Sequence, residues 1–93
     1  MDDLKAMFQS ITPEEGTRIT SVHYGYVGKL PTRQEIWSWD GIKGKTVVFR
    51  SEDVTNLSDY ELERLVRSEL GVEGQMTIKR TDRFAFVNHS FHS

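Results

Sequence analysis

The stretch from Lys45 to His89 decides the fold, and it ends in Arg83-Phe84-Ala85-Phe86-Val87-Asn88-His89. Successive side chains of a strand point to opposite faces, so Phe84 and Phe86 share one face while Ala85 and Val87 share the other. The small and the β-branched side chain suit a face that a helix covers. The two phenylalanines either stack on bases or lie under another part of the chain, and this choice bears directly on function.

A helix is predicted before this strand, over residues 58–70. Ser58-Asp59-Tyr60-Glu61 has the pattern of a capping box, in which the Ser58 hydroxyl and the Glu61 carboxylate each accept from the other residue's amide. Gly71 is expected as a left-handed C-terminal cap. The apolar stripe of this helix is Leu62, Leu65, Val66 and Leu70.

The remaining elements follow from hydrophobic periodicity. A short amphipathic helix is expected over residues 2–11, and strands are expected at 17–28, 34–40, 46–50, 75–80 and 83–89. Lys29-Leu30-Pro31-Thr32 is expected to break the chain between strands, and Asp40-Gly41 to begin a turn. The fold predicted is an α+β two-layer sandwich of order αββ-βαββ, with four or five antiparallel strands and both helices on one face.

Composition bounds the class of protein. A chain of 93 residues makes a single domain, residues 1–93, and a net charge of −2 argues against whole-surface binding to nucleic acid. The absence of cysteine favours a cytoplasmic location, and neither a membrane span nor a signal peptide is expected. The charge is segregated, since the helix at 58–70 is acidic and the final hairpin is basic. Either both surfaces are simply solvated and have no partner, or the charge separation makes the molecule polar, so that the sheet end attracts anions.

Three segments resemble an RNA-recognition motif, and most of all the C-terminal RNA-binding domain of DbpA-like DEAD-box helicases. They are Val47-Val48-Phe49-Arg50, the helix end Glu69-Leu70-Gly71-Val72-Glu73-Gly74, and the run from Ile78 to Val87 that contains Asp82-Arg83-Phe84-Ala85-Phe86-Val87. The match covers about half of the chain, residues 45–89. It implies a ferredoxin-like βαββαβ sheet whose aromatic strand binds RNA.

The chain departs from that family in three ways. The family continues after the aromatic strand with a helix and a strand, which here would come from the N-terminus as a circular permutation. Alternation points Val47 and Phe49 inward and Arg50 outward, so the first motif strand offers no aromatic ring. Asp82-Arg83 replaces the usual basic residue and glycine, which removes one close backbone approach to a base.

The preferred function is a small non-catalytic binding protein that holds RNA or single-stranded nucleic acid on an open sheet face. Stacking is assigned to Phe84 and Phe86, and phosphate contact to Arg50, Lys79, Arg80 and Arg83. The alternative is a protein-binding adaptor or inhibitor, such as a phage or plasmid accessory protein. It would use the same face or the edge that carries Trp37 and Trp39, with Tyr24 and Tyr26 as further candidates. The chain would be a monomer or a homodimer joined through a sheet edge.

No catalytic residue, cofactor or metal site is predicted. His89 and His92 have a metal-like spacing, but a strand would place them on opposite faces and no carboxylate accompanies them. The glycines at 25, 28, 41 and 44 form no phosphate loop, because no helix begins at the required spacing. The sequence shows no nucleophile–base pattern either.

Overall fold

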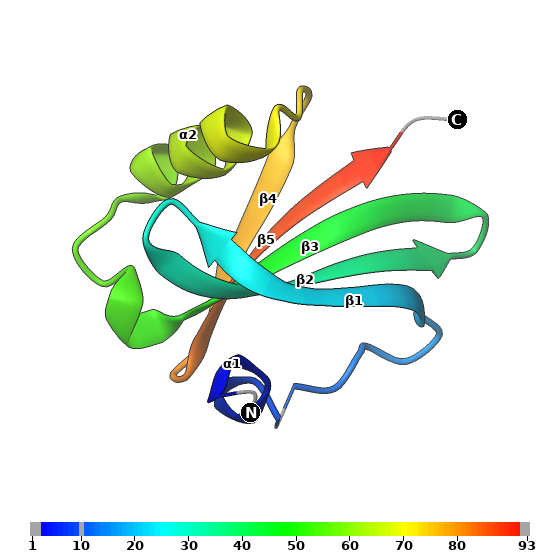
Figure 1. Cartoon of the computed structure of the whole chain (residues 1–93). Coiled ribbons are helices and arrows are strands. Elements are labelled where there is room, and N and C mark those ends of the chain that lie inside the picture. Colours follow the sequence, from blue (N-terminus) through cyan, green and yellow to red (C-terminus); the bar gives the residue numbers. More distant parts are fainter. Residues whose placement is uncertain (1–2, 10, 92–93) are drawn as a thin grey trace.

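The computed structural model describes residues 3–9 and 11–91. Its elements are α1 (Asp3–Met7), β1 (Arg18–Val27), β2 (Leu30–Trp39), β3 (Ile42–Arg50), η1 (Ser51–Asp53), α2 (Asp59–Leu70), β4 (Met76–Arg80) and β5 (Phe84–Phe91). They form a small α+β fold around one five-stranded antiparallel sheet (Figure 1). No helix in this described part of the chain has the length and apolarity needed to cross a bilayer.

The strand order in the sheet is β1-β2-β3-β5-β4. Consecutive hairpins join β1, β2 and β3, so the N-terminal part of the sheet is a meander. The chain then leaves β3, passes through α2 and returns in β4, and β5 fills the gap between β3 and β4. This part is a split β-α-β unit, in which β3 and β4 run parallel with an antiparallel strand between them.

One surface of the sheet, called here the α2 face, is covered by α2 (Figure 1). Leu62 and Val66 of α2 pack on Val47, Phe49 and the facing side chains of β5. Both helix ends agree with the sequence prediction: the Ser58–Glu61 capping box forms, and Gly71 adopts a left-handed conformation. The predicted stripe on α2 is therefore confirmed as a core-facing stripe.

The other surface of the sheet, the opposite face, carries α1. Phe8, which follows α1, is fully buried against Val48 and Phe84. Because Val48 and Val47 are neighbours in one strand and point to opposite sides, α1 and α2 lie on different faces. The prediction of two helices on one face is wrong, and α1 does not take the place of the second helix of a permuted motif. The reason is that Val48 and Phe84 leave an apolar surface there, and α1 buries it.

The hairpin between β1 and β2 is tighter than the sequence suggested. Gly28 has φ of 64° and lies in a two-residue loop, so β2 begins at Leu30 and not at Gln34. Pro31 is tolerated inside the strand because pairing of β2 with β3 begins only at Thr32, so the missing proline N–H costs no bond to β3. At the next hairpin Asp40 and Gly41 both have positive φ, as predicted for a tight turn, and β3 starts at Ile42.

The α2 face predicts a large stability cost for truncating its most buried leucine. Leu62 has no exposed surface, so Leu62→Ala should leave a cavity and lower the free energy of unfolding by about 2–5 kcal/mol. Urea unfolding followed by circular dichroism measures this. Ser68→Ala, on the exposed side of the same helix, is the control and should change stability by less than about 0.5 kcal/mol. Equal effects of the two substitutions would contradict the assignment of Leu62 to the core.

A candidate binding cavity beneath the N-terminal segment

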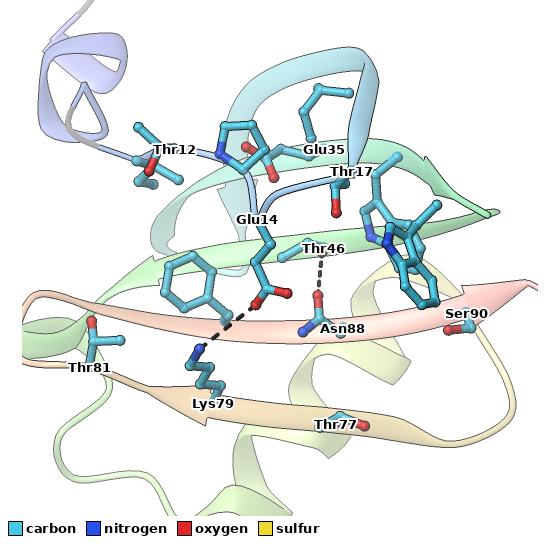
Figure 2. Close-up of a pocket in the computed structure, with 16 residues that line it drawn as sticks. Thr12, Glu14, Thr17, Glu35, Thr46, Thr77, Lys79, Thr81, Asn88 and Ser90 are labelled. Atoms are coloured by element: carbon cyan, nitrogen blue, oxygen red, sulfur yellow. Dashed lines mark hydrogen bonds and ion pairs between the residues drawn. The ribbon is translucent and has the colours of Figure 1, made fainter. Parts of the chain in front are cut away.

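The chain between α1 and β1 crosses the opposite face and leaves a cavity beneath it. Residues 11–17, called here the N-terminal segment, form one wall, and β2, β3, β5 and β4 form the floor (Figure 2). The cavity has a volume of about 530 Å³. This lies within the range of pockets that bind small molecules.

A row of polar side chains crosses the cavity floor at right angles to the strands. Strand pairing places Glu35 opposite Thr46, Thr46 opposite Asn88, and Asn88 opposite Thr77. The Thr46 hydroxyl donates a hydrogen bond to Asn88 Oδ1, which holds the middle of the row together (Figure 2). The floor therefore offers hydrogen-bonding groups from four adjacent strands.

Glu35 is the buried acid of this row. Its side chain is 8% exposed, and Arg33 Nη2 lies 2.9 Å from Glu35 Oε2. Oε2 is thus ion-paired, and it accepts no hydrogen bond from the described residues. Burial raises the pKa of the Glu35 carboxyl, and the positive charge of Arg33 offsets only part of that effect. Arg33 also donates to the Phe8 carbonyl at 3.2 Å, and thereby links the buried acid to the end of α1.

Two tryptophans border the other end of the cavity. Trp37 lies on Gly44 of the neighbouring strand so closely that a Cβ atom at Gly44 would be 2.2 Å from its ring. The indole N–H of Trp37 is buried and donates to no acceptor among the described residues. Trp39 is 48% exposed, and its ring approaches Gly16 of the N-terminal segment.

The N-terminal segment is held over the cavity by few contacts. Ile11 packs on the cluster around Phe8. Glu14 reaches across the cavity toward Lys79 of β4, with Oε1 and Nζ 3.8 Å apart (Figure 2). Both side chains of that ion pair are mostly exposed, so the pair contributes little to stability.

The two predicted stacking residues have different surroundings. Phe84 is 8% exposed and packs on Phe8, with ring centroids 6.0 Å apart. Phe86 is half-buried, meets Phe84 edge to face, and lines the cavity. Only Phe86 therefore presents surface to a ligand in the cavity, because α1 and Phe8 cover its neighbour.

The predicted phosphate-binding residues do not converge on one site. Arg50 makes two hydrogen bonds to the Asp53 carboxylate, from Nε at 2.8 Å and from Nη2 at 3.0 Å. Arg80 points to the α2 face, where it binds Asp59 and the carbonyls of Val54 and Leu57. Lys79, the residue before Arg80 in β4, points to the opposite face.

Arg83 is exposed and lies over the Phe84 ring, 5.5 Å from its centroid. Of the four basic residues proposed for phosphate contact, Arg83 is thus the one for which no carboxylate partner is found in the described part of the chain.

The residues proposed for protein binding divide into two groups. Trp37 and Trp39 lie together at the cavity. Tyr24 packs beside Phe8 and Arg33, whereas Tyr26 is 62% exposed near the end of β1. Sequence reasoning missed the polar row, although the alternation that places Trp37 and Trp39 on one face of the predicted strand 34–40 extends to Glu35.

No group of three potential metal ligands occurs among residues 3–9 and 11–91. The prediction that a strand places His89 and His92 on opposite faces involves His92, which lies outside the described residues. Comparison of the chain with protein-family models, curated proteins and solved structures gives no significant match. What the cavity does must therefore be inferred from its own geometry.

The contact between Trp37 and Gly44 predicts that Gly44→Ala is destabilising. The added methyl would also lie 2.7 Å from the His89 carbonyl, so the ring and a backbone atom both have to move. We expect a loss of about 1–3 kcal/mol in urea unfolding, with a changed near-ultraviolet dichroism of the tryptophans. Gly25→Ala, where the added atom meets only the end of the His23 side chain, is the control and should cost less. A neutral Gly44→Ala would contradict the close packing.

The buried acid predicts a pH-dependent stability difference between the wild type and Glu35→Gln. Since the pKa of Glu35 is higher in the folded protein than its ordinary value of 4.5, the folded state binds the proton more tightly. The resulting stabilisation is complete below the unfolded pKa and is lost as the pH rises through the folded one. The free energy of unfolding of the wild type minus that of Glu35→Gln should therefore fall as the pH rises.

Urea titrations at several pH values from about 4 to about 7 would measure this difference, a range that begins near the ordinary pKa of a glutamate and extends above it. The exposed Glu15→Gln serves as the matched control for removing one charge. A difference that grows with pH for Glu35→Gln would show that its ionised form is favoured by folding, contrary to the burial argument.

Proposed function

We propose that this chain is a non-catalytic binding protein that docks a protein partner on the opposite face, at the cavity beneath the N-terminal segment. The observation that carries the proposal is the pairing of an aromatic rim with a polar floor in the cavity. Trp37, Trp39 and Phe86 supply the apolar surface. Thr46, Asn88 and Thr77 supply hydrogen-bonding groups along the floor.

The rim continues onto an exposed apolar surface at the tip of the β2–β3 hairpin. Trp39 and Ile42 lie directly opposite each other there, 48% and 44% exposed. Tryptophan is enriched among the residues that contribute most binding energy at protein interfaces. A partner side chain entering the cavity would bury both the rim and this hairpin tip.

Electrostatics favours a protein over a nucleic acid as the ligand of this face. The cavity contains the acids Glu14 and Glu35, and Lys79 points toward Glu14. A phosphate backbone would find Lys79 facing Glu14, and Arg50 and Arg80 already engaged by Asp53 and Asp59. A partner with an apolar or aromatic anchor and a nearby hydrogen-bond donor fits the site better.

A crosslinking experiment tests the proposal. A photoreactive phenylalanine analogue placed at Trp39 should link a partner that the same analogue at Tyr60, exposed on α2, does not link. The linked protein is then purified and its affinity is measured for the wild type, Trp39→Ala and Tyr60→Ala. We expect Trp39→Ala to weaken binding about 30-fold, as for an interface hot spot of about 2 kcal/mol, and Tyr60→Ala to leave it unchanged.

Titration of labelled single-stranded RNA at low salt is the competing arm. Saturable binding that Phe86→Ala weakens, together with equal crosslinking at positions 39 and 60, would overturn the protein-partner proposal. That result would support the nucleic-acid function instead, with Phe86 as the stacking residue.

A further inference from the structure

The outer edge of β1 has free backbone groups along a regular segment. A two-residue loop joins β1 to β2, so the closing pair Val27–Leu30 is hydrogen-bonded. Counting back along β1 from Val27, every second residue likewise directs its backbone N–H and C=O groups toward β2. The intervening residues, Val22, Tyr24 and Tyr26, therefore direct their N–H and C=O groups outward. Among the described residues, these three make no backbone hydrogen bond outside the β1–β2 ladder.

The two edges of the sheet differ in how they are protected. The other edge strand, β4, has only five residues and carries Lys79 and Arg80, which discourage pairing with another strand. In β1, a bulge between Ile19 and Ser21 interrupts the ladder, and the regular part that follows is Ser21–Val27. This segment contains no Lys, Arg, Asp, Glu or Pro. It therefore lacks the charged side chains and prolines with which proteins block an exposed edge.

The segment is also symmetric about its centre. Tyr24 is the middle residue of Ser21–Val27, and Val22 and Tyr26 lie two residues to either side. A second copy of the segment, related by a two-fold axis through Tyr24, would pair Val22 with Tyr26 of the second copy, and Tyr24 with its own counterpart. In this register the backbone N–H and C=O groups of all three outward-facing residues form hydrogen bonds with the second copy.

We propose that β1 is a homodimer interface, in which two chains join edge to edge in this register and form one continuous sheet. The two side chains that the register brings together are exposed in the single chain, Val22 by 40% and Tyr26 by 62%. A β-branched residue opposite an aromatic one is a favourable cross-strand pair, and the two-fold axis forms it twice. No like-charged side chains are opposed within the segment, which favours a second copy as the occupant.

The cavity and the dimer edge share no lining residue, although Val22 lies opposite Glu35 in the neighbouring strand. The cavity is built on β2, β3, β5 and β4, and on the β1 side it uses Ile19 and Thr17, which precede the regular segment. Partner docking and edge pairing are therefore compatible, and each can fail without the other.

Disulfide trapping tests both the dimer and its register, because the chain has no cysteine of its own. Val22→Cys and Tyr26→Cys chains are mixed in a glutathione redox buffer. A hydrogen-bonded antiparallel pair has Cα atoms about 5.5 Å apart, which suits a disulfide. The mixture should form a covalent heterodimer. Val22→Cys alone should not link, because its two copies would be about 13 Å apart along the strands.

Thr77→Cys, exposed on the β4 edge, is the matched control and should not link to Val22→Cys. Sedimentation of the unmodified full chain over a range of concentrations should show a monomer–dimer equilibrium. Val22→Lys should weaken this dimer at least about tenfold, whereas Ile42→Lys, which removes a similarly exposed apolar residue away from the edge, should not. A monomer at every concentration, or self-linking of Val22→Cys equal to that of the mixture, would overturn the proposal.

Discussion

The packing of Phe8 on Val48 and Phe84 is the contact on which the opposite face of the sheet depends. Around Val48 and Phe84 the central strands β3 and β5 are apolar on both sides, so a single helix cannot bury them there. Covering the α2 face with one twelve-residue helix leaves Val48 and Phe84 in need of a second cover. The N-terminal residues provide it, and in crossing the sheet they also create the cavity.

On each face of the sheet an arginine is held by partners within the fold. Arg33 is held between the Phe8 carbonyl and the buried Glu35, so the end of α1 and the polar row of the cavity are connected through one guanidinium. On the α2 face, Arg80 binds the carboxylate of Asp59 and two carbonyls that precede α2. Arginine is suited to both tasks, because its planar group donates several hydrogen bonds in fixed directions. These cations have structural partners and do not form a basic surface.

The cavity and the β1 edge follow from the same meander of β1, β2 and β3. The β2–β3 hairpin carries Trp37 and Trp39 to the rim, and β1 becomes the outermost strand of the sheet. The bulge near Thr20 lets Ile19 face the cavity beside Trp37, and it also marks where the regular part of the free edge begins. A one-residue irregularity thus separates a strand end that lines the cavity from a strand segment that is available for pairing.

The sequence by itself determined the local elements whose causes are local. Ser58, Glu61 and Gly71 specified the ends of α2, and the alternation of Phe84 to Val87 specified which side chains share a face. The Asp40-Gly41 turn was predictable because both residues tolerate positive φ. The start of β2 was not, since Pro31 is acceptable only because the pairing of β2 with β3 begins one residue later, at Thr32.

Only the tertiary structure decided which face α1 covers, because its apolar stripe fits either surface of the sheet. With α1 on the opposite face, Phe84 is buried, Phe86 lies at the cavity, and Glu35 and Arg33 are largely buried. The polar row could not be derived from sequence for the same reason, as strand register brings Glu35, Thr46, Asn88 and Thr77 together from four separate strands. The sequence specifies the chemistry of each side chain. Which side chains come into contact depends on how the two faces of the sheet pack, because packing and strand register bring together residues that are far apart in the chain.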